Sequence, residues 1–280
     1  MRNLHMLEVT PSNNLSKLRL GFVKTNVTSS EQDTENRTLS FQEFSILLST
    51  ATVGLKDGPY LLRGPCHGHR SNKNMTEAYV LVIDGDSSFN AITGIVNNIS
   101  APPIVDAHNV LKHLGLTHVI HTSHSHFLEG KGNRWRAYIP TSRPYTQEEI
   151  EVINSSMHKL MQEVGCNVVQ TNESGTFSQP WYMPRKATED ALFEHHMHVG
   201  NAFDVDAVIE KSFVCISGLS AKELEAFERL SKQKCPTEIT LFNATHSVAE
   251  LLSKHGYKKS KSFGHNDRWI HLNSNSGQLD

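Results

Sequence analysis

The sequence has little cysteine. Its 280 residues include four cysteines, Cys66, Cys166, Cys215 and Cys235, which are widely spaced and form no CxxC pair. A disulfide framework or a zinc ribbon is therefore not expected. No apolar run approaches the roughly 20 residues of a membrane-spanning helix, and residues 1–20 lack the apolar block of a signal peptide. We expect a cytoplasmic, reduced protein with no membrane segment.

The chain also lacks an excess of either charge. Lys and Arg number 27 and Asp and Glu number 29, so the formal net charge is −2. This balance by itself gives no indication of nucleic acid. Basic residues are nevertheless concentrated in residues 131–143 and 254–268. A local basic stripe is enough to attract a phosphate backbone, and we expect modest, salt-sensitive binding.

No internal repeat is visible, and strand and helix patterns are mixed along the chain. The apolar run 79–83 predicts a buried strand, and 118–122 and 134–139 predict two more. Apolar residues at three- and four-residue spacing predict helices over 104–114 and from Thr146, with Glu149 completing a capping box, to Val164. Further helices are expected over 221–230 and 246–255. This order indicates an α+β or α/β core.

Two carboxylates follow the predicted strand 79–83. Asp84 and Asp86 are separated by one residue, so on a strand both side chains project to the same side. Close like charges resist joint ionisation unless a cation lies between them. Carboxylate oxygens of this kind suit Mg²⁺ or Mn²⁺. The alternative is a polar turn, because Asp-Gly is common in turns.

Histidines, hydroxyls and basic residues are dense after the second predicted strand. Residues 121–126 read His-Thr-Ser-His-Ser-His, side chains that can bind a metal, hold phosphates or transfer protons. Arg134 and Arg136 share one face of the third predicted strand, and two guanidinium groups on one face match phosphate oxygens. Lys131 and Arg143 flank them. The alternative in each case is an ordinary solvated surface.

A second basic segment lies near the C-terminus, where aromatic residues interleave with the charges. Lysines attract phosphate and aromatic rings offer stacking surfaces for bases. A solvated charged face is the alternative. The basic residues of this segment are Lys258, Lys259, Lys261 and Arg268.

Five segments occur in a recognisable order. They are an apolar strand ending in Asp-x-Asp (79–86), a Ser-containing segment ending in His (122–126), an Arg-x-Arg strand that runs into Pro-x-Ser-Arg-Pro (134–144), Ser-Gln-x-x-Tyr-x-Pro (178–184), and residues 267–277. Together they resemble the plasmid- and phage-encoded primases of the archaeo-eukaryotic primase superfamily, over most of residues 50–280.

The resemblance implies an α+β fold. Residues 1–217 would form an RRM-like catalytic core, a mixed or antiparallel sheet flanked by helices, and residues 218–280 a smaller helical, basic segment. It implies a primase or primase-polymerase that makes short primers on a single-stranded DNA template from nucleoside triphosphates in plasmid- or phage-type replication.

Roles for individual residues follow from the same resemblance. Asp84 and Asp86 would hold the Mg²⁺ or Mn²⁺ ions of a two-metal site. His126, with Ser123 or Ser125, would contact the triphosphate. Arg134 and Arg136 would also bind phosphate. The residues expected to contact DNA are Lys131, Arg143, Lys258, Lys259, Lys261 and Arg268.

The sequence departs from the family in its third acidic residue. Glu173 is the only carboxylate in the stretch before Ser178, and we predict it as the third metal ligand and catalytic carboxylate. If Asn172 occupies the equivalent position instead, metal affinity would fall. No Gly-x-x-x-x-Gly-Lys-Ser/Thr loop is present, so helicase activity is not expected in this chain. A replicative helicase is an expected partner, because many relatives carry one beyond the primase core.

Two other functions stay open. A replication-initiation nickase of the HUH type would use His124 and His126 around one metal and Tyr182 as its nucleophile, although that class has a bulky apolar residue where Ser125 stands. A primase-like domain without catalytic activity would bind DNA or a partner only. The uncertainty at Asn172 motivates this last hypothesis.

Overall fold

The computed structural model describes residues 15, 17–27, 34–217, 252–254, 257–259, 269–271 and 278–279. The chain divides into two units, Met1–Lys211 and Ser212–Asp280. Each unit is described by itself below. The division after residue 217 that the sequence suggested stays a prediction.

The first unit mixes short strands with a few helices. Its helices are α1 (Phe41–Leu48), α2 (Ile104–His113), α3 (Ile150–Glu163), α4 (Asn172–Gly175) and the start of α5 (Val205–Ser217), with a 3₁₀ turn at Asn72–Asn74. Its strands are β1 (Leu18–Val23), β2 (Thr34–Leu39), β3 (Thr52–Val53), β4 (Tyr60–Leu62), β5 (Ala78–Gly85), β6 (Ser88–Phe89), β7 (Val96–Asn97), β8 (His118–Thr122), β9 (Trp135–Tyr145), β10 (Trp181–Tyr182), β11 (Arg185–Lys186) and β12 (His195–His198).

Two antiparallel sheets organise this unit. The central sheet has the order β12-β8-β9-β5, and the second sheet has the order β10-β4-β1-β2. A parallel pair, β3 with β11, and a small hairpin of β6 and β7 complete the strands. The α+β class predicted from the sequence is therefore confirmed, with antiparallel sheets and flanking helices.

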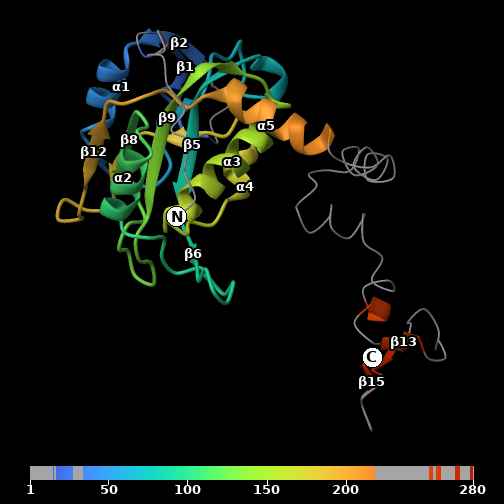
Figure 1. Ribbon diagram of the computed structural model, residues 1–280. Coiled ribbons are helices and arrows are strands. Elements are labelled where there is room, and N and C mark those ends of the chain that lie inside the picture. The colour runs from blue at the N-terminus through green and yellow to red at the C-terminus, as the bar shows by residue number, and fades with distance from the viewer. Residues whose placement is uncertain are drawn as a thin grey trace. The chain divides into compact units, whose positions relative to one another are not determined.

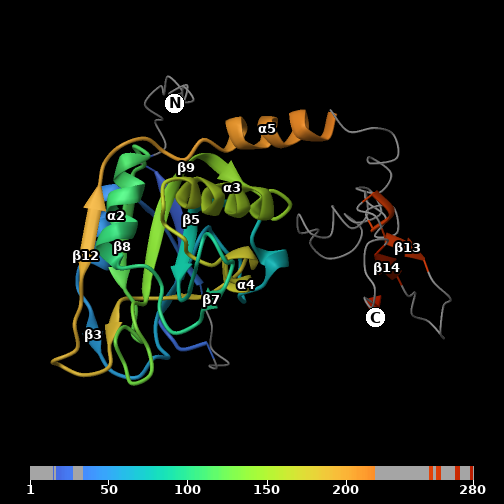
Figure 2. The ribbon, with the colours of Figure 1, turned by 60° about the horizontal axis from the view of Figure 1, so that its bottom comes forward.

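The central sheet is buried on both faces. Along β5, Leu81 and Ile83 pack with the apolar residues of α2 and α3, whereas Val80 and Val82 pack with those of β1, β4 and α1. Figures 1 and 2 show α2 and α3 on the same face of this sheet. Because side chains alternate along a strand, the even-numbered positions of β5 face the second sheet. Asp84 continues that even-numbered series.

The predicted core elements are confirmed, and the polar-turn alternative for Asp84 is wrong. Strand β5 continues through Gly85 and pairs Asp84 with Arg136 and Gly85 with Trp135 on β9. A Cβ atom at Gly85 would overlap the Trp135 ring. The glycine is therefore required by close packing inside a strand and not by a turn. The predicted capping box before α3 is half formed, because the Glu149 carboxylate accepts the Thr146 backbone N–H at 2.8 Å.

The described residues of the second unit comprise the end of α5, a short helical stretch and three strands. An antiparallel sheet joins β13 (Tyr257–Lys259), β14 (Trp269–His271) and β15 (Gln278–Leu279), and residues 252–254 are helical. Several predictions fall outside the described residues. They are the helix expected over 221–230, most of the helix expected over 246–255, and the predicted DNA contacts Lys261 and Arg268. No helix in the described parts of the chain is both long and apolar enough to cross a bilayer.

Candidate active site

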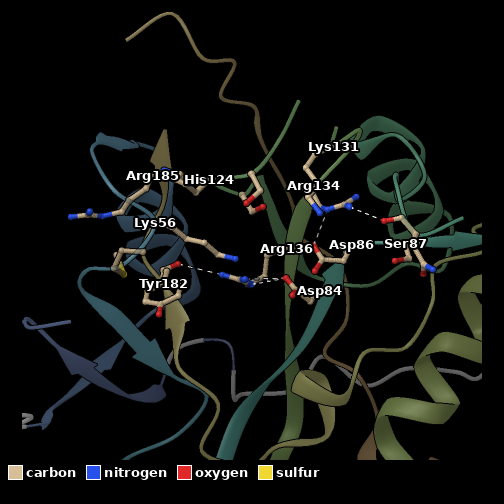
Figure 3. Close-up of a pocket in the computed structure, with 14 residues that line it drawn as sticks. Lys56, Asp84, Asp86, Ser87, His124, Lys131, Arg134, Arg136, Tyr182 and Arg185 are labelled. Carbon is tan, nitrogen blue, oxygen red and sulfur yellow. Dashed lines mark hydrogen bonds and ion pairs between the residues drawn. The ribbon is translucent and has the colours of Figure 1, made fainter. Parts of the chain in front are cut away.

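A polar pocket opens where the two sheets of the first unit meet. Its lining joins segments that are far apart in the sequence: Lys56, Asp84, Asp86, Ser87, Asn98, Ser123, His124, Ser125, Lys131, Arg134, Arg136, Tyr182, Met183 and Arg185. Figure 3 shows Lys56, Tyr182 and Arg185 on one side and Asp86 and Arg134 on the other. Seven of the residues predicted for metal, nucleotide or DNA binding line this pocket: Asp84, Asp86, Ser123, Ser125, Lys131, Arg134 and Arg136.

The strand periodicity explains this convergence. Asp84 and Asp86 extend the face of β5 that packs against the second sheet, and Arg134 and Arg136 extend the same face of β9, to which Tyr138 belongs. Because β5 and β9 are antiparallel neighbours with Asp84 opposite Arg136, carboxylates and guanidinium groups are brought side by side at the end of the buried region.

Asp84 is buried and paired with Arg136. Its carboxylate oxygen Oδ1 accepts hydrogen bonds from Nε and Nη2 of Arg136, both at 3.0 Å, and the two side chains are each 11% exposed. Burial raises the pKa of the Asp84 carboxyl, and Arg136 opposes this shift only in part. Burial acts to lower the pKa of the Arg136 guanidinium, but Asp84 and Tyr138 outweigh it and the pKa is raised. The guanidinium also lies 4.8 Å from the centre of the Trp181 ring.

The Asp86 side chain is half exposed, unlike that of Asp84. One oxygen lies 3.3 Å from Nε of Arg134, whose side chain is 5% exposed. Arg134 is itself anchored by hydrogen bonds to the backbone carbonyls of Asn133 and Asn98, at 2.9 and 3.0 Å. Asp86 therefore offers an accessible carboxylate, while Arg134 is a positively charged side chain fixed in the wall beside it.

The histidine-rich loop after β8 contributes His124 and the two serines to the pocket, but not His126. His126 is buried, and its Nδ1 accepts the backbone N–H of Arg134 at 3.1 Å. Its Nε2 has no hydrogen-bond partner among the described residues, and burial lowers its pKa. His124 lines the pocket and its Nε2 contacts the Gly54 carbonyl at 2.9 Å. The triphosphate contact expected of His126 stays a prediction.

The opposite wall was not identified from the sequence, apart from Tyr182 in the nickase hypothesis. Arg185 donates to the carbonyls of Leu55 and Asp57, at 2.8 and 3.1 Å, and its guanidinium occupies the space that a side chain at position 58 would need. Arg185 directly follows the motif that ends at Pro184, so proximity to that motif was an available signal. Nothing in the sequence around Lys56 distinguishes it.

Two other predicted site residues of the first unit, Arg143 and Glu173, do not line this pocket. Arg143 forms ion pairs with Glu149 and Asp206, both at 2.7 Å, so its charge is already compensated. Glu173 lies on α4, is exposed and does not line the pocket. Lys258 and Lys259 belong to β13 of the second unit, and Lys258 is exposed.

The donor set fits a hard divalent cation that has few protein ligands. Asp84 and Asp86 supply carboxylate oxygens, and Mg²⁺ is commonly bound by one or two carboxylates together with water and substrate phosphates. Within the described part of the chain no three His, Cys, Asp or Glu side chains converge as a metal site. Glu173 does not line the pocket, but its charge contributes to the raised pKa of the Asp84 carboxyl. Its role as a third carboxylate ligand stays a prediction.

One ring nitrogen of each histidine in the nickase hypothesis is already engaged by a backbone group. His124 turns to the Gly54 carbonyl and His126 to the Arg134 backbone. Tyr182 does line the pocket. Burial, with Asp57 beside the hydroxyl, raises the pKa of the Tyr182 phenol, which disfavours the phenolate that a nucleophile needs.

Comparisons with known proteins found matches only among solved structures. No family model matches the sequence, and no curated protein matches it. The AEP domain of the cyanophage S-2L primase-polymerase is similar with a TM-score of 0.34 and 9% identity, over 71% of this chain and 89% of that one. A primase, RepB', is similar with a TM-score of 0.31 and 12% identity, over 87% of this chain and 72% of that one.

Both of these structures are named as primases, the group that the sequence motifs resemble. With TM-scores below 0.5 and such low identity, they carry no weight in the assignment of a function. That assignment depends on the pocket.

Proposed function

We propose that the pocket is the active site of a template-directed nucleotidyltransferase that makes short primers on single-stranded DNA. One observation carries the proposal. The pocket unites three of the five motif segments at their chemistry-bearing residues: Asp84 and Asp86, Ser123 and Ser125, and Arg134 with Arg136. A fourth segment contributes Tyr182. Such convergence is expected if the motifs mark one site for a nucleoside triphosphate.

The charge of the pocket suits a triphosphate. Five basic side chains, Lys56, Lys131, Arg134, Arg136 and Arg185, face two carboxylates. Guanidinium groups fixed by the protein bind phosphate oxygens with directional hydrogen bonds. Arg134 is fixed by backbone carbonyls and Arg136 by Asp84. Both are therefore held in place before a substrate binds.

Asp84 and Asp86 would hold Mg²⁺ or Mn²⁺. When bound, such an ion lowers the pKa of an attacking hydroxyl and stabilises charge on the leaving phosphate. The chain's own residues prepare this place. Arg136 compensates the buried Asp84 until a cation competes for the same carboxylate, and Arg134 keeps Asp86 oriented. Ser123 and Ser125 supply hydroxyl groups that can bond phosphate oxygens.

The test is primer synthesis by the purified chain with Mn²⁺, nucleoside triphosphates and a single-stranded DNA oligonucleotide. We expect short products from the wild type and a loss of about 100-fold or more in Asp86→Ala. Asp86 is half exposed, so this variant should fold normally. Asp106→Ala, which changes an exposed aspartate on α2, is the matched control and should retain activity.

Other results would assign a different function. A wild-type protein that neither makes product nor binds a nucleotide would overturn the proposal. Binding of DNA and nucleotide without any product would favour a primase-like domain that has lost catalysis, as the exposed position of Glu173 allows. A covalent protein–DNA adduct that disappears in Tyr182→Phe would favour the nickase, because Tyr182 shares the pocket.

Plasmid- or phage-type replication, and work beside a replicative helicase, belong to the same proposal. They rest on the motif resemblance alone. A coupled assay, in which helicase and chain are mixed on a forked DNA substrate, would test the partner.

A further inference from the structure

An apolar surface projects beside the candidate active site. The hairpin of β6 and β7 extends from the end of β5, as the ribbon shows (Figure 1). Its side chains Ile92, Ile95, Val96 and Ile99 are 96%, 70%, 47% and 62% exposed, and Phe127, on the loop between β8 and β9, is 56% exposed. We call these five residues the hairpin surface. Exposed aliphatic and aromatic side chains gathered in this way commonly mark an interaction site.

The hairpin holds its exposed side chains in place by an ordered turn. The side-chain oxygen of Asn90 accepts the backbone N–H groups of Ile92 and Thr93, at 2.9 and 3.0 Å. The Asn90 backbone exchanges hydrogen bonds with Ile95 and Gly94, at 2.9 and 2.8 Å. Gly94 has a φ of +69°, which favours glycine. The apolar residues are therefore presented on a defined backbone.

Phe127 is tied to the same structure. Its backbone N–H donates to the Gly132 carbonyl at 3.1 Å, and the Gly132 N–H donates to the Ile99 carbonyl at 2.9 Å. Phe127 has a φ of +53°, the sole positive value at a non-glycine residue in the described part of the chain. A bulky residue in this region is strained. The ring of this strained residue is exposed and packs on His126, with the two ring centroids 4.2 Å apart.

The hairpin surface is continuous with the phosphate-binding side of the pocket. Ser87 and Asn98, which flank the hairpin strands, line the pocket, and the Asn98 carbonyl anchors Arg134. Lys131, on the same loop as Phe127, also lines it. Basic side chains beside exposed apolar side chains suit a single strand of nucleic acid, whose phosphates are anionic and whose bases are flat and apolar on their faces.

We propose that the hairpin surface contacts the bases of the single-stranded nucleic acid whose backbone lies along Lys131 and Arg134. This inference rests on the proposed function, because it places the template of that reaction. Phe127 provides a ring for base stacking, and Ile92, Ile95, Val96 and Ile99 exclude water from the neighbouring bases. The two predicted segments for DNA, 131–143 and 254–268, do not include this hairpin.

The test is the affinity of the full chain for a labelled oligothymidylate, measured by fluorescence anisotropy at about 50 and about 200 mM salt. The variants are Ile92→Ser with Ile95→Ser, and Phe127→Asn, since asparagine tolerates a positive φ. Ile46→Ser, at a residue that is 64% exposed on α1, is the matched control. Lys131→Ala reports the electrostatic contribution.

We expect the hairpin variants to raise Kd about fivefold or more at both salt concentrations, because stacking and apolar contacts are not screened by salt. Lys131→Ala should weaken binding chiefly at low salt, and Ile46→Ser should bind like the wild type. Nucleotide binding, measured separately, should be unchanged in the hairpin variants.

The results separate this inference from the proposed function. If the wild type makes primers and the hairpin variants bind the oligonucleotide normally, the inference is wrong and the function stands. If DNA affinity depends on the hairpin but no product forms, the inference stands and the function does not. If the wild type binds no oligonucleotide, the inference fails. A wild-type dimer that becomes a monomer in the hairpin variants, with normal DNA binding, would make the surface a protein interface and overturn the inference.

Discussion

Asp84 and Arg136 should be strongly coupled in energy, so that removal of the arginine alone destabilises the first unit. The relevant variants are Arg136→Met, which keeps apolar contact with Trp181, Asp84→Asn, which keeps the shape of the carboxylate, and the double variant. The charged atoms are 3.0 Å apart and each side chain is 11% exposed. With an effective dielectric constant of about 20, Coulomb attraction at this distance is about 5 kcal/mol.

Desolvation reduces the net contribution of such a pair to the free energy of unfolding, but it increases the free-energy cost of removing one partner. Removal of one partner leaves the other charge buried, which typically costs about 3–5 kcal/mol. Arg136→Met should therefore lose about 3 kcal/mol or more, because Asp84 is left buried without its partner. Asp84→Asn should lose much less, because burial already disfavours the charged carboxylate, and the double variant should lose clearly less than Arg136→Met alone. We expect a coupling energy of about 3 kcal/mol or more from the double-mutant cycle.

The assay is urea unfolding at pH 7, with Arg19 and Glu77 as the matched pair. These two groups are 2.8 Å apart, but their side chains are 51% and 27% exposed, and an exposed pair contributes about 1 kcal/mol or less. A coupling energy below about 1 kcal/mol for Asp84 and Arg136 would contradict this expectation, because the pair would then behave like a surface pair.

The pH dependence gives a second check of the same pair. Burial raises the pKa of folded Asp84 above its unfolded value, so its contribution to stability is fully present below the unfolded pKa and is lost as pH rises through the folded pKa. Asp84→Asn should remove this dependence. The coupling to Arg136 should shrink as the pH falls and Asp84 becomes protonated.

Two further predictions concern the core around the site. Gly85→Ala should destabilise the fold by about 1–3 kcal/mol or more, because the new methyl group overlaps the buried Trp135 ring. Gly175→Ala, where nothing lies within 4 Å, is the control, and equal melting temperatures for the two variants would contradict the packing described. Burial lowers the pKa of His118 to about 4, so the stability it contributes is present above about pH 6.5 and is lost as the pH falls toward 4. His118→Gln should flatten this decline by roughly 2–3 kcal/mol between pH 7 and pH 4.5 in urea unfolding, and an unchanged pH profile would show that His118 is not the group responsible.

Part of this protein was determined by local sequence pattern alone. The run 79–83, the helical spacing of 104–114 and the alternation of 134–139 located β5, α2 and β9, because the period of apolar residues reports which face is buried. The same period placed Asp84 with Asp86, and Arg134 with Arg136, on one side of their strands. These residues were found because strand geometry links them to the buried pattern.

The way in which these segments meet depends on contacts between residues that are far apart in the sequence. The pairing of β5 with β9 set Asp84 opposite Arg136, and the second sheet brought Lys56 and Arg185 to the pocket from segments without a distinguishing pattern. The structure also turned His126 into the protein and His124 toward the pocket. Which of two histidines in a loop faces a site depends on hydrogen bonds to distant backbone groups. A local sequence pattern does not contain those contacts.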